Sequence, residues 1–307
     1  MEDHELTHDE LVWANRIKEE LWKSTRIKDG SISDWECVEL ALTSIERSQD
    51  LQVAEDQAWK LQCFREHYNF EVDMKEAEAM QLLRDIILQM PGSILGLDYL
   101  RDSGHYLFVY DFAKFFPDRI QTERDWRSLM GGFYVLHQIM NSNLSSIRQG
   151  ASFIFECEGA GFHNMDPAVE QRWLMEFGSF YPLKKHEIQW IHAPSVAVMM
   201  YSMVKRFVPA ADHQVNKMCG DLEGFEGGRI DQLYNQPTLE VAQEHLIQRL
   251  PQCLRERMIN QQNFLLPVPT TRPHAPPTMS ITAEPVDDDD NASVIMEFEE
   301  DEYYSDG

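Results

Sequence analysis

Residues 150–159 read Gly-Ala-Ser-Phe-Ile-Phe-Glu-Cys-Glu-Gly, a run of bulky β-forming side chains that ends in an acidic turn. Similar short apolar runs occur on both sides of it, and segments long enough for helices separate them. A parallel strand needs a crossover of about a dozen residues, so this alternation predicts an α/β fold with a largely parallel sheet. The expected strands are residues 106–110, 152–155, 188–191 and 215–219, and the expected crossover helices are residues 126–140, 167–180 and 194–208.

The first part of the chain carries helical signals instead. Ser33 and Asp34 precede a run of apolar residues, and residues 75–88 place apolar side chains at three-and-four spacing. We therefore expect a helical N-terminal lobe over residues 1–92 and an α/β domain over residues 93–255.

The charge is strongly acidic and unevenly placed. The 307 residues include 52 acidic and 27 basic side chains, a net charge of -25. Because nucleic-acid binding needs a Lys or Arg at each phosphate contact, we expect no nucleic-acid partner. Residues 281–307 hold eleven acidic and no basic residues and follow a proline-rich stretch. Residues 256–307 are therefore predicted to be a linker and a disordered acidic tail.

The acidic tail permits two interpretations. It can act as a solvating, self-repelling end, or it can dock a protein partner through the apolar residues 294–298 with Tyr303 and Tyr304.

Cysteine usage and the N-terminus predict a cytoplasmic protein. The five cysteines include no Cys-x-x-Cys pair, which argues against a disulfide framework and a zinc module. The N-terminus is acidic where a signal peptide would be basic and then apolar, and no stretch reaches the length of a membrane span.

The sequence contains no motif of a known catalytic site. It has no Gly-x-Ser-x-Gly, no phosphate-binding loop with Lys-Ser or Lys-Thr, and no His-Glu-x-x-His. Cys157 lies between Glu156 and Glu158, whose carboxylates are expected to raise the pKa of its thiol. We therefore expect no enzyme activity, no metal and no cofactor.

Two segments resemble the CRAL-TRIO lipid-binding family. Residues 150–159 are similar to the family's strand that ends in Asp-x-x-Gly. Residues 180–194, Phe-Tyr-Pro-Leu-Lys-Lys-His-Glu-Ile-Gln-Trp-Ile-His-Ala-Pro, are similar to its Tyr-Pro…Ile-x-x-Ile-Asn-x-Pro. Residues 61–72, 202–208 and 217–220 agree in order with further family segments, so the resemblance covers residues 55–220.

Several positions depart from the family pattern. His192 stands where the family has Asn, Glu156 where it has Asp, and Arg206 where it has Pro. The basic residues of the family's N-terminal segment are replaced by Cys63, Glu66 and Tyr68, which weakens the case for a phosphoinositide contact from that lobe. The usual family ending is also absent after Gly220.

The resemblance implies an apolar cavity on the sheet, closed by a mobile lid helix, that holds one lipophilic small molecule or phospholipid and exchanges it at membranes. The lid is expected at residues 194–207, which begin with Pro and are apolar almost all round until Lys205; an ordinary buried helix would show the same pattern. The expected ligand-binding residues are Phe133, His137, Phe153, Phe155, Trp173, Phe177, Leu183, Val196, Met199, Met200, Met203, Val204 and Phe207.

Two of these assignments have competing explanations. His137 can donate a hydrogen bond to the polar end of the ligand, or it can be a core histidine. The basic residues Lys184, Lys185, Lys205 and Arg206 can meet a headgroup or an anionic membrane surface, or they can be solvated side chains beside a strand. A ligand-free interaction protein with the same fold, docking partners through its acidic tail, remains the alternative function.

Overall fold

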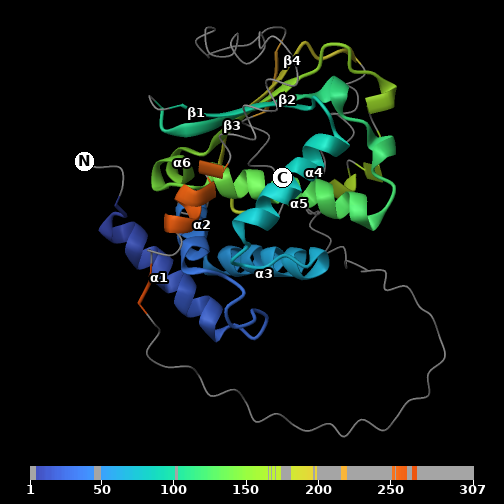
Figure 1. The fold of residues 1–307 in the computed structure, drawn as a ribbon. Helices are drawn as coiled ribbons and strands as arrows, with labels where there is room; N and C mark the ends of the chain where they lie inside the picture. Colours follow the sequence, from blue (N-terminus) through green and yellow to red (C-terminus); the bar gives the residue numbers. More distant parts are fainter. Residues whose placement is uncertain are drawn as a thin grey trace, which may run out of the picture. The chain divides into compact units, whose positions relative to one another are not determined.

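The computed structural model describes residues 5–44, 50–100, 103–164, 166, 168–169, 171–173, 181–195, 198, 216–219, 251–252, 254–260 and 265–267 (Figure 1). The chain divides into two compact units, Met1–Arg272 and Pro273–Gly307, and the description covers parts of the first. The predictions for residues 174–180, for most of the proposed lid, and for the acidic tail therefore lie outside the described residues.

Four helices form the N-terminal part, as the sequence predicts. Thr7 caps the first of them with a capping box, and Asp50 caps the third through the amide of Gln52. The third ends at Asn69, whose φ of 54° is the left-handed conformation that asparagine tolerates. The helices are α1 (His8–Lys23), α2 (Asp34–Ser44), α3 (Leu51–Tyr68) and α4 (Glu76–Gln89).

A five-stranded sheet follows, and its strand order along the sheet is the order along the chain. Neighbouring strands from β2 to β5 pair in parallel, whereas β1 pairs antiparallel with β2 at one edge. The α/β prediction with a largely parallel sheet is confirmed. The strands are β1 (Ile94–Leu100), β2 (His105–Asp111), β3 (Ala151–Glu156), β4 (Lys185–Ile191) and β5 (Asn216–Cys219).

Strand β1 was not predicted from the sequence. It begins twelve residues before the first predicted strand, at residues 106–110, and it contains Gly96 and Asp98, two residue types that strands disfavour. An edge strand with one neighbour is only half buried, so it shows a weaker apolar pattern than the strands inside the sheet.

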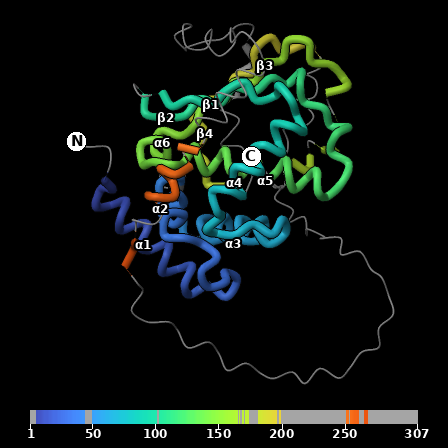
Figure 2. The backbone as a smooth tube through the Cα atoms, viewed as in Figure 1, coloured from blue at the N-terminus to red at the C-terminus, as the bar shows by residue number. Residues whose placement is uncertain are grey.

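Helix α5 (Glu123–Met140) crosses from β2 to β3 and contacts both the sheet and α4, which lies beside it (Figures 1 and 2). Its backbone approaches α4 closely at two glycines. A Cβ at Gly131 would lie 2.7 Å from Leu82, and one at Gly132 would lie 2.5 Å from Ile86. These contacts require glycine because a larger side chain would force the two helices apart. The connections also contain α6 (Leu144–Gln149), η1 (Phe112–Lys114), η2 (Pro117–Arg119) and η3 (Phe162–Asn164).

Both faces of the sheet are apolar, as expected for buried parallel strands. Phe108, Phe153 and Phe155 belong to the large core shared with α4 and α5. Val109 and Ile154 point to the opposite face, where a smaller cluster forms. Phe153 and Phe155 thus share one face, and strand alternation places Ile154 on the other, as predicted.

Two buried ion pairs involve α2, and their arginines connect the helical part to the rest of this unit. Glu36 on α2 pairs with Arg65 on α3, which also donates from Nε to the hydroxyl of Tyr134 on α5 at 2.7 Å. Glu39 on α2 pairs with Arg257, whose side chain is 2 % exposed. Residues 254–260 are helical, whereas the sequence predicts a linker from residue 256 onward.

Replacing Arg257 by Met should lower the free energy of unfolding by about 3–5 kcal/mol, because Glu39 would stay buried without its cation. Replacing Arg255 by Met is the matched control: it removes an exposed pair with Glu76 from the same helical segment and should have a much smaller effect. The double variant with Glu39→Met should recover part of the loss in urea denaturation. Equal effects of the two arginine variants would show that the buried pair does not hold this segment.

Candidate ligand-binding site

The candidate site is built on an aromatic layer between the sheet and α5. Phe155 on β3 stacks on Trp190 of β4 with ring centroids 4.4 Å apart. On the other wall, Phe133 of α5 lies 5.5 Å from Trp173. Strand pairing explains the first contact, because Phe155 and Trp190 are register partners. The aromatic residues predicted to line a ligand site therefore come from neighbouring elements of one core.

The two walls touch each other over part of this layer. Phe133 lies 6.4 Å from Phe108 and 6.1 Å from Tyr110, both on β2. His137, one helical turn further, lies 6.3 Å from Phe153. Side chains fill the space where these rings meet, so a ligand on this face would lie beside the contact, over β3 and β4.

The exposure of the strand residues differs between the two faces. Phe153 and Phe155 keep 8 % and 9 % of their surface exposed, whereas Val109 and Ile154 on the opposite face keep none. The face toward α5 is therefore less completely covered along β3 than the face behind it.

His137 is a buried residue within this layer. Its ring lies 5.1 Å from that of Tyr181, edge to face. Burial, with a smaller contribution from Lys185, holds the pKa of His137 well below its usual value. The imidazole is therefore neutral in the folded protein at physiological pH, a state in which it can donate one hydrogen bond and accept another.

The structure describes only some of the predicted ligand-binding residues. It brings Phe133, Phe153, Phe155 and Leu183 into one core, with Trp173 packed against it and half-buried, and it places the buried His137 beside Phe153. The amide of Val198 donates to the carbonyl of Pro194, as in the first turn of a helix. The remaining predicted residues lie outside the described part of the chain: Phe177, Val196, Met199, Met200, Met203, Val204 and Phe207.

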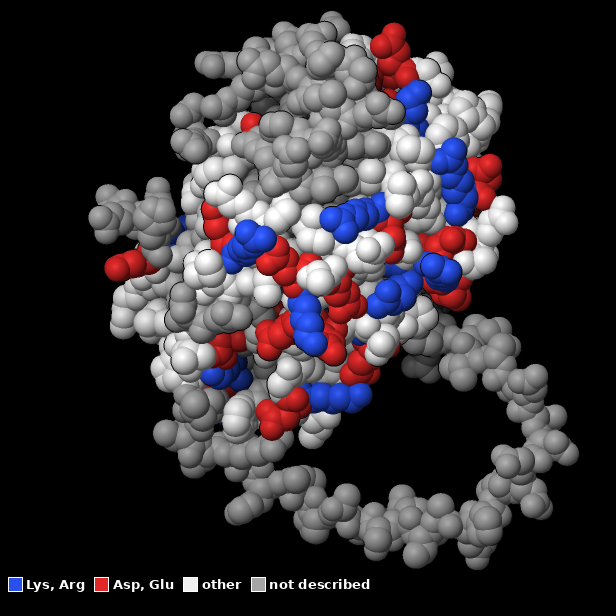
Figure 3. All heavy atoms as spheres, viewed as in Figure 1, with Lys and Arg blue, Asp and Glu red and all other residues white. Residues whose placement is uncertain are grey.

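The predicted basic residues are only partly described as well. Lys184 is half-buried, and its ammonium donates to the carbonyl of Arg148 at 2.7 Å. Lys185 is also half-buried, while Lys205 and Arg206 are outside the described residues. On the face drawn in Figure 3, the basic and acidic side chains of the described residues are interspersed. Within the described residues, no helix is both long and apolar enough to cross a membrane.

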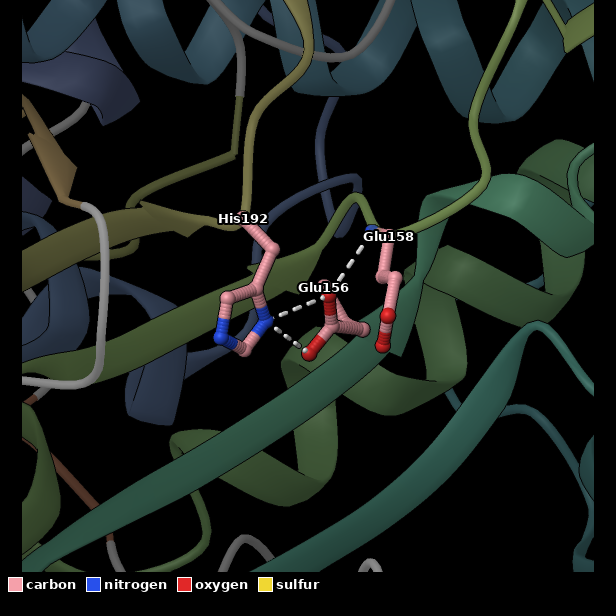
Figure 4. A group of neighbouring side chains, drawn as sticks. All are labelled: Glu156, Glu158 and His192. Atoms are coloured by element: carbon pink, nitrogen blue, oxygen red, sulfur yellow. Dashed lines mark hydrogen bonds and ion pairs between the residues drawn. The ribbon is translucent and has the colours of Figure 1, made fainter.

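Acidic and imidazole side chains meet where β3 and β4 end (Figure 4). Nδ1 of His192 lies 3.0 Å from both carboxylate oxygens of Glu156, and the amide of Glu158 donates to Glu156 at 2.8 Å. Ligand atoms of all three residues lie within 4.8 Å of one another, so these residues could hold a cation. The pairing of His192 with Glu156 accounts for their positions without one.

This contact explains two departures that the sequence analysis noted separately. Glu156 and His192 are the residues that replace the family's Asp and Asn, and they touch each other. Parallel pairing of β3 with β4 brings the two positions together. The sequence already indicated this contact, because each of the two residues directly follows a predicted strand and the two predicted strands are neighbours.

Cys157 is a poor candidate for a nucleophile. Burial, together with the charges of Glu156 and Asp111, raises the pKa of its thiol to about 12. The thiol is therefore protonated at physiological pH, as the flanking carboxylates predict. Cys37, Cys63 and Cys157, the cysteines in the described part of the chain, are all free thiols.

Comparison with protein families matches residues 92–254, more than half of the chain, to the CRAL/TRIO domain. The chain belongs to the CRAL/TRIO family. The fold is thus a lipid-binding fold, in agreement with the resemblance seen in the sequence. Among solved structures, the CRAL/TRIO protein is similar to Sfh5 at 12 % identity and a TM-score of 0.46, over 74 % of this chain and 84 % of that one. A sequence comparison with curated proteins finds no match.

The buried, neutral His137 predicts a pH dependence of stability in this CRAL/TRIO protein. Its folded pKa is depressed, so the unfolded chain binds the proton first as the pH falls below about 6.5. Stability is then fully present above that pH and declines below it, by up to about 1.4 kcal/mol per pH unit for one group.

Replacing His137 by Leu should remove this contribution, as measured by urea denaturation between pH 7.5 and 5.5. Replacing the exposed His67 by Gln should leave the change in the free energy of unfolding with pH, the slope, as it is in the wild type. His105 is also buried with a lowered pKa, so both histidines contribute to the pH dependence of stability in the wild type. The difference between the wild type and His137→Leu therefore isolates the contribution of His137. An unchanged pH dependence in His137→Leu would mean that the imidazole has the same pKa in the folded and unfolded states, which would contradict the prediction.

Proposed function

We propose that this CRAL/TRIO protein encloses one lipophilic small molecule or phospholipid and exchanges it at membranes. The ligand lies over β3 and β4 beside the aromatic contact of α5, with Phe153, Phe155 and Trp190 as its floor and Phe133 and Trp173 at its side. The segment at residues 194–207 covers it and opens for exchange. The observation that carries this proposal is the aromatic face of β3, which keeps residual exposure within a lipid-binding fold.

The aromatic floor suits an apolar ligand. Phe153, Phe155 and Trp190 offer flat apolar surfaces, and ligand sites are lined mainly by such side chains with a few polar groups that orient the ligand. His137 is the polar group that we assign to this role, because its neutral ring lies against Phe153 and can hydrogen-bond a polar end.

The rival interpretation is an interaction protein whose interior is filled by its own side chains. The direct contacts of Phe133 with Phe108 and Tyr110 support it, since they occupy part of the space between the two walls. The two functions differ in whether purified protein carries a lipid.

Extraction of the purified full chain with organic solvent, followed by mass spectrometry, should recover about one lipophilic molecule per chain. Replacing Trp190 by Ala should lower the ligand affinity at least tenfold by removing one ring of the floor. Trp22→Ala on α1 is the matched control, because Trp22 is also half-buried but lies outside the aromatic layer, and it should keep the ligand. Wild-type protein that is repeatedly empty would favour the interaction protein.

Membrane exchange predicts binding to anionic vesicles through the basic residues beside the lid. Changing these basic residues together to Gln should weaken binding to vesicles that contain phosphatidylserine, because each cation contributes about 1 kcal/mol near the surface. Added salt should weaken the binding of the wild-type protein to the same vesicles. Phosphatidylcholine vesicles serve as the neutral reference. The four residues are Lys184, Lys185, Lys205 and Arg206, and a control set of exposed cations is Lys23, Lys60, Arg84 and Arg124.

The vesicle experiment should be repeated without residues 281–307, because the acidic tail can repel an anionic surface. If neither the full chain nor the shortened chain binds anionic vesicles more strongly than neutral ones at low salt, the membrane step must be removed from the proposal. The proposed ligand binding would not be affected by that result.

A further inference from the structure

Four polar atoms without hydrogen-bond partners among the described residues lie in the buried junction around Arg257. They are Oε2 of Glu39, Nη2 of Arg257, Oδ1 of Asn141 and the hydroxyl oxygen of Tyr181. Glu39 and Asn141 are completely buried, Arg257 is 2 % exposed and Tyr181 is 6 % exposed. Buried polar atoms in native proteins almost always have a partner, so four in one place need an explanation.

Existing contacts connect Glu39, Asn141 and Arg257 and reach Pro182, the residue that follows Tyr181. Nη1 of Arg257 donates to Glu39 and to the main-chain carbonyl of Asn141, the latter at 3.4 Å. Nδ2 of Asn141 donates to the carbonyl of Pro182 at 3.0 Å, next to Tyr181. Burial raises the pKa of Tyr181 well above its usual value, and the charges of Glu39 and Arg257 also act on its hydroxyl. Glu39, Asn141 and Arg257 are therefore in contact, and the hydroxyl of Tyr181 lies within range of the charges of Glu39 and Arg257.

The hydrogen-bonding capacity that remains is balanced. Arg257 Nη2 and the Tyr181 hydroxyl can donate, whereas Glu39 Oε2 and Asn141 Oδ1 can accept. The bond from Asn141 Nδ2 to Pro182 fixes which amide atom is left over. Two donors and two acceptors are the complement of one water molecule, which accepts two hydrogen bonds and donates two.

Other small ligands fit less well. A metal cation would be repelled by the guanidinium of Arg257, and an anion would be repelled by the carboxylate of Glu39. A neutral molecule that both donates and accepts avoids both penalties, and buried water commonly makes about three such bonds.

We propose that Glu39, Asn141, Tyr181 and Arg257 bind an ordered internal water molecule. The water links α2, α5, the segment before β4 and the helical residues 254–260. It completes the hydrogen bonding of a junction that the direct ion pair leaves partly unsatisfied. The site adjoins the proposed ligand site, because the ring of Tyr181 packs against His137, but its test does not depend on a bound lipid.

A crystal structure of the full chain at high resolution is the direct test. We expect a water peak within hydrogen-bonding distance, about 2.6–3.2 Å, of at least three of the four atoms. An interior without a peak, in which Glu39 Oε2 and the Tyr181 hydroxyl instead bond directly to protein atoms, would overturn the proposal.

Thermal unfolding of Tyr181→Phe gives an independent test through the sign of its effect. If the hydroxyl bonds to water, its removal should lower the melting temperature, because a hydrogen bond is lost and the water keeps fewer partners. If the hydroxyl has no partner, its removal should leave the melting temperature unchanged or raise it, because an unsatisfied buried group disappears. The second result would overturn the proposal.

Tyr134→Phe calibrates that measurement. The hydroxyl of Tyr134 already accepts a hydrogen bond from Arg65 at 2.7 Å, and its ring also lies in the buried core. Its loss should lower the melting temperature whether or not the water is present. A decrease for Tyr181→Phe comparable to the decrease for Tyr134→Phe is the expected result.

Discussion

The buried pairing of α2 with two arginines is the constraint on which the arrangement of the first unit depends. Glu36 and Glu39 are one helical turn apart, so one face of α2 presents two carboxylates to the interior. A buried charge without a partner is strongly destabilising, so Arg65 and Arg257 must reach these positions whenever the unit is folded. Hydrophobic contacts tolerate small shifts between helices, whereas these pairs specify which segments meet.

The pairs also fix the inner wall of the candidate site. Arg65 bonds to Tyr134, and Arg257 bonds to the carbonyl of Gln138, so both arginines hold the same helix, α5. Helix α5 also packs on α4 through Gly131 and Gly132. Phe133 and His137 therefore project from a helix that several contacts hold in place. The proposed exchange of a ligand would then require movement elsewhere in the chain.

Much of the fold could be predicted because it depends on local pattern. The apolar run at residues 152–155 and the helical lengths around it were sufficient for the parallel sheet, and alternation placed Phe153 and Phe155 on one face. The edge strand β1 was missed because Gly96 and Asp98 interrupt its apolar pattern. Its strand conformation depends instead on pairing with a single neighbour, β2. The pairing of Arg257 with Glu39 was beyond prediction, since 218 residues separate them and an isolated arginine usually indicates surface.

The contact of Glu156 with His192 limits how far family motifs can be transferred. The two residues lie at the ends of adjacent strands, where the sequence resembles the CRAL/TRIO motifs. His192 has a φ of 49°, a left-handed conformation that asparagine adopts more readily than most residues. The chemistry of the pair nevertheless differs, because a longer carboxylate now faces an imidazole that can carry charge. The family match therefore does not decide the chemistry at these two positions, and polar contacts to a ligand must be derived from the side chains of this chain itself.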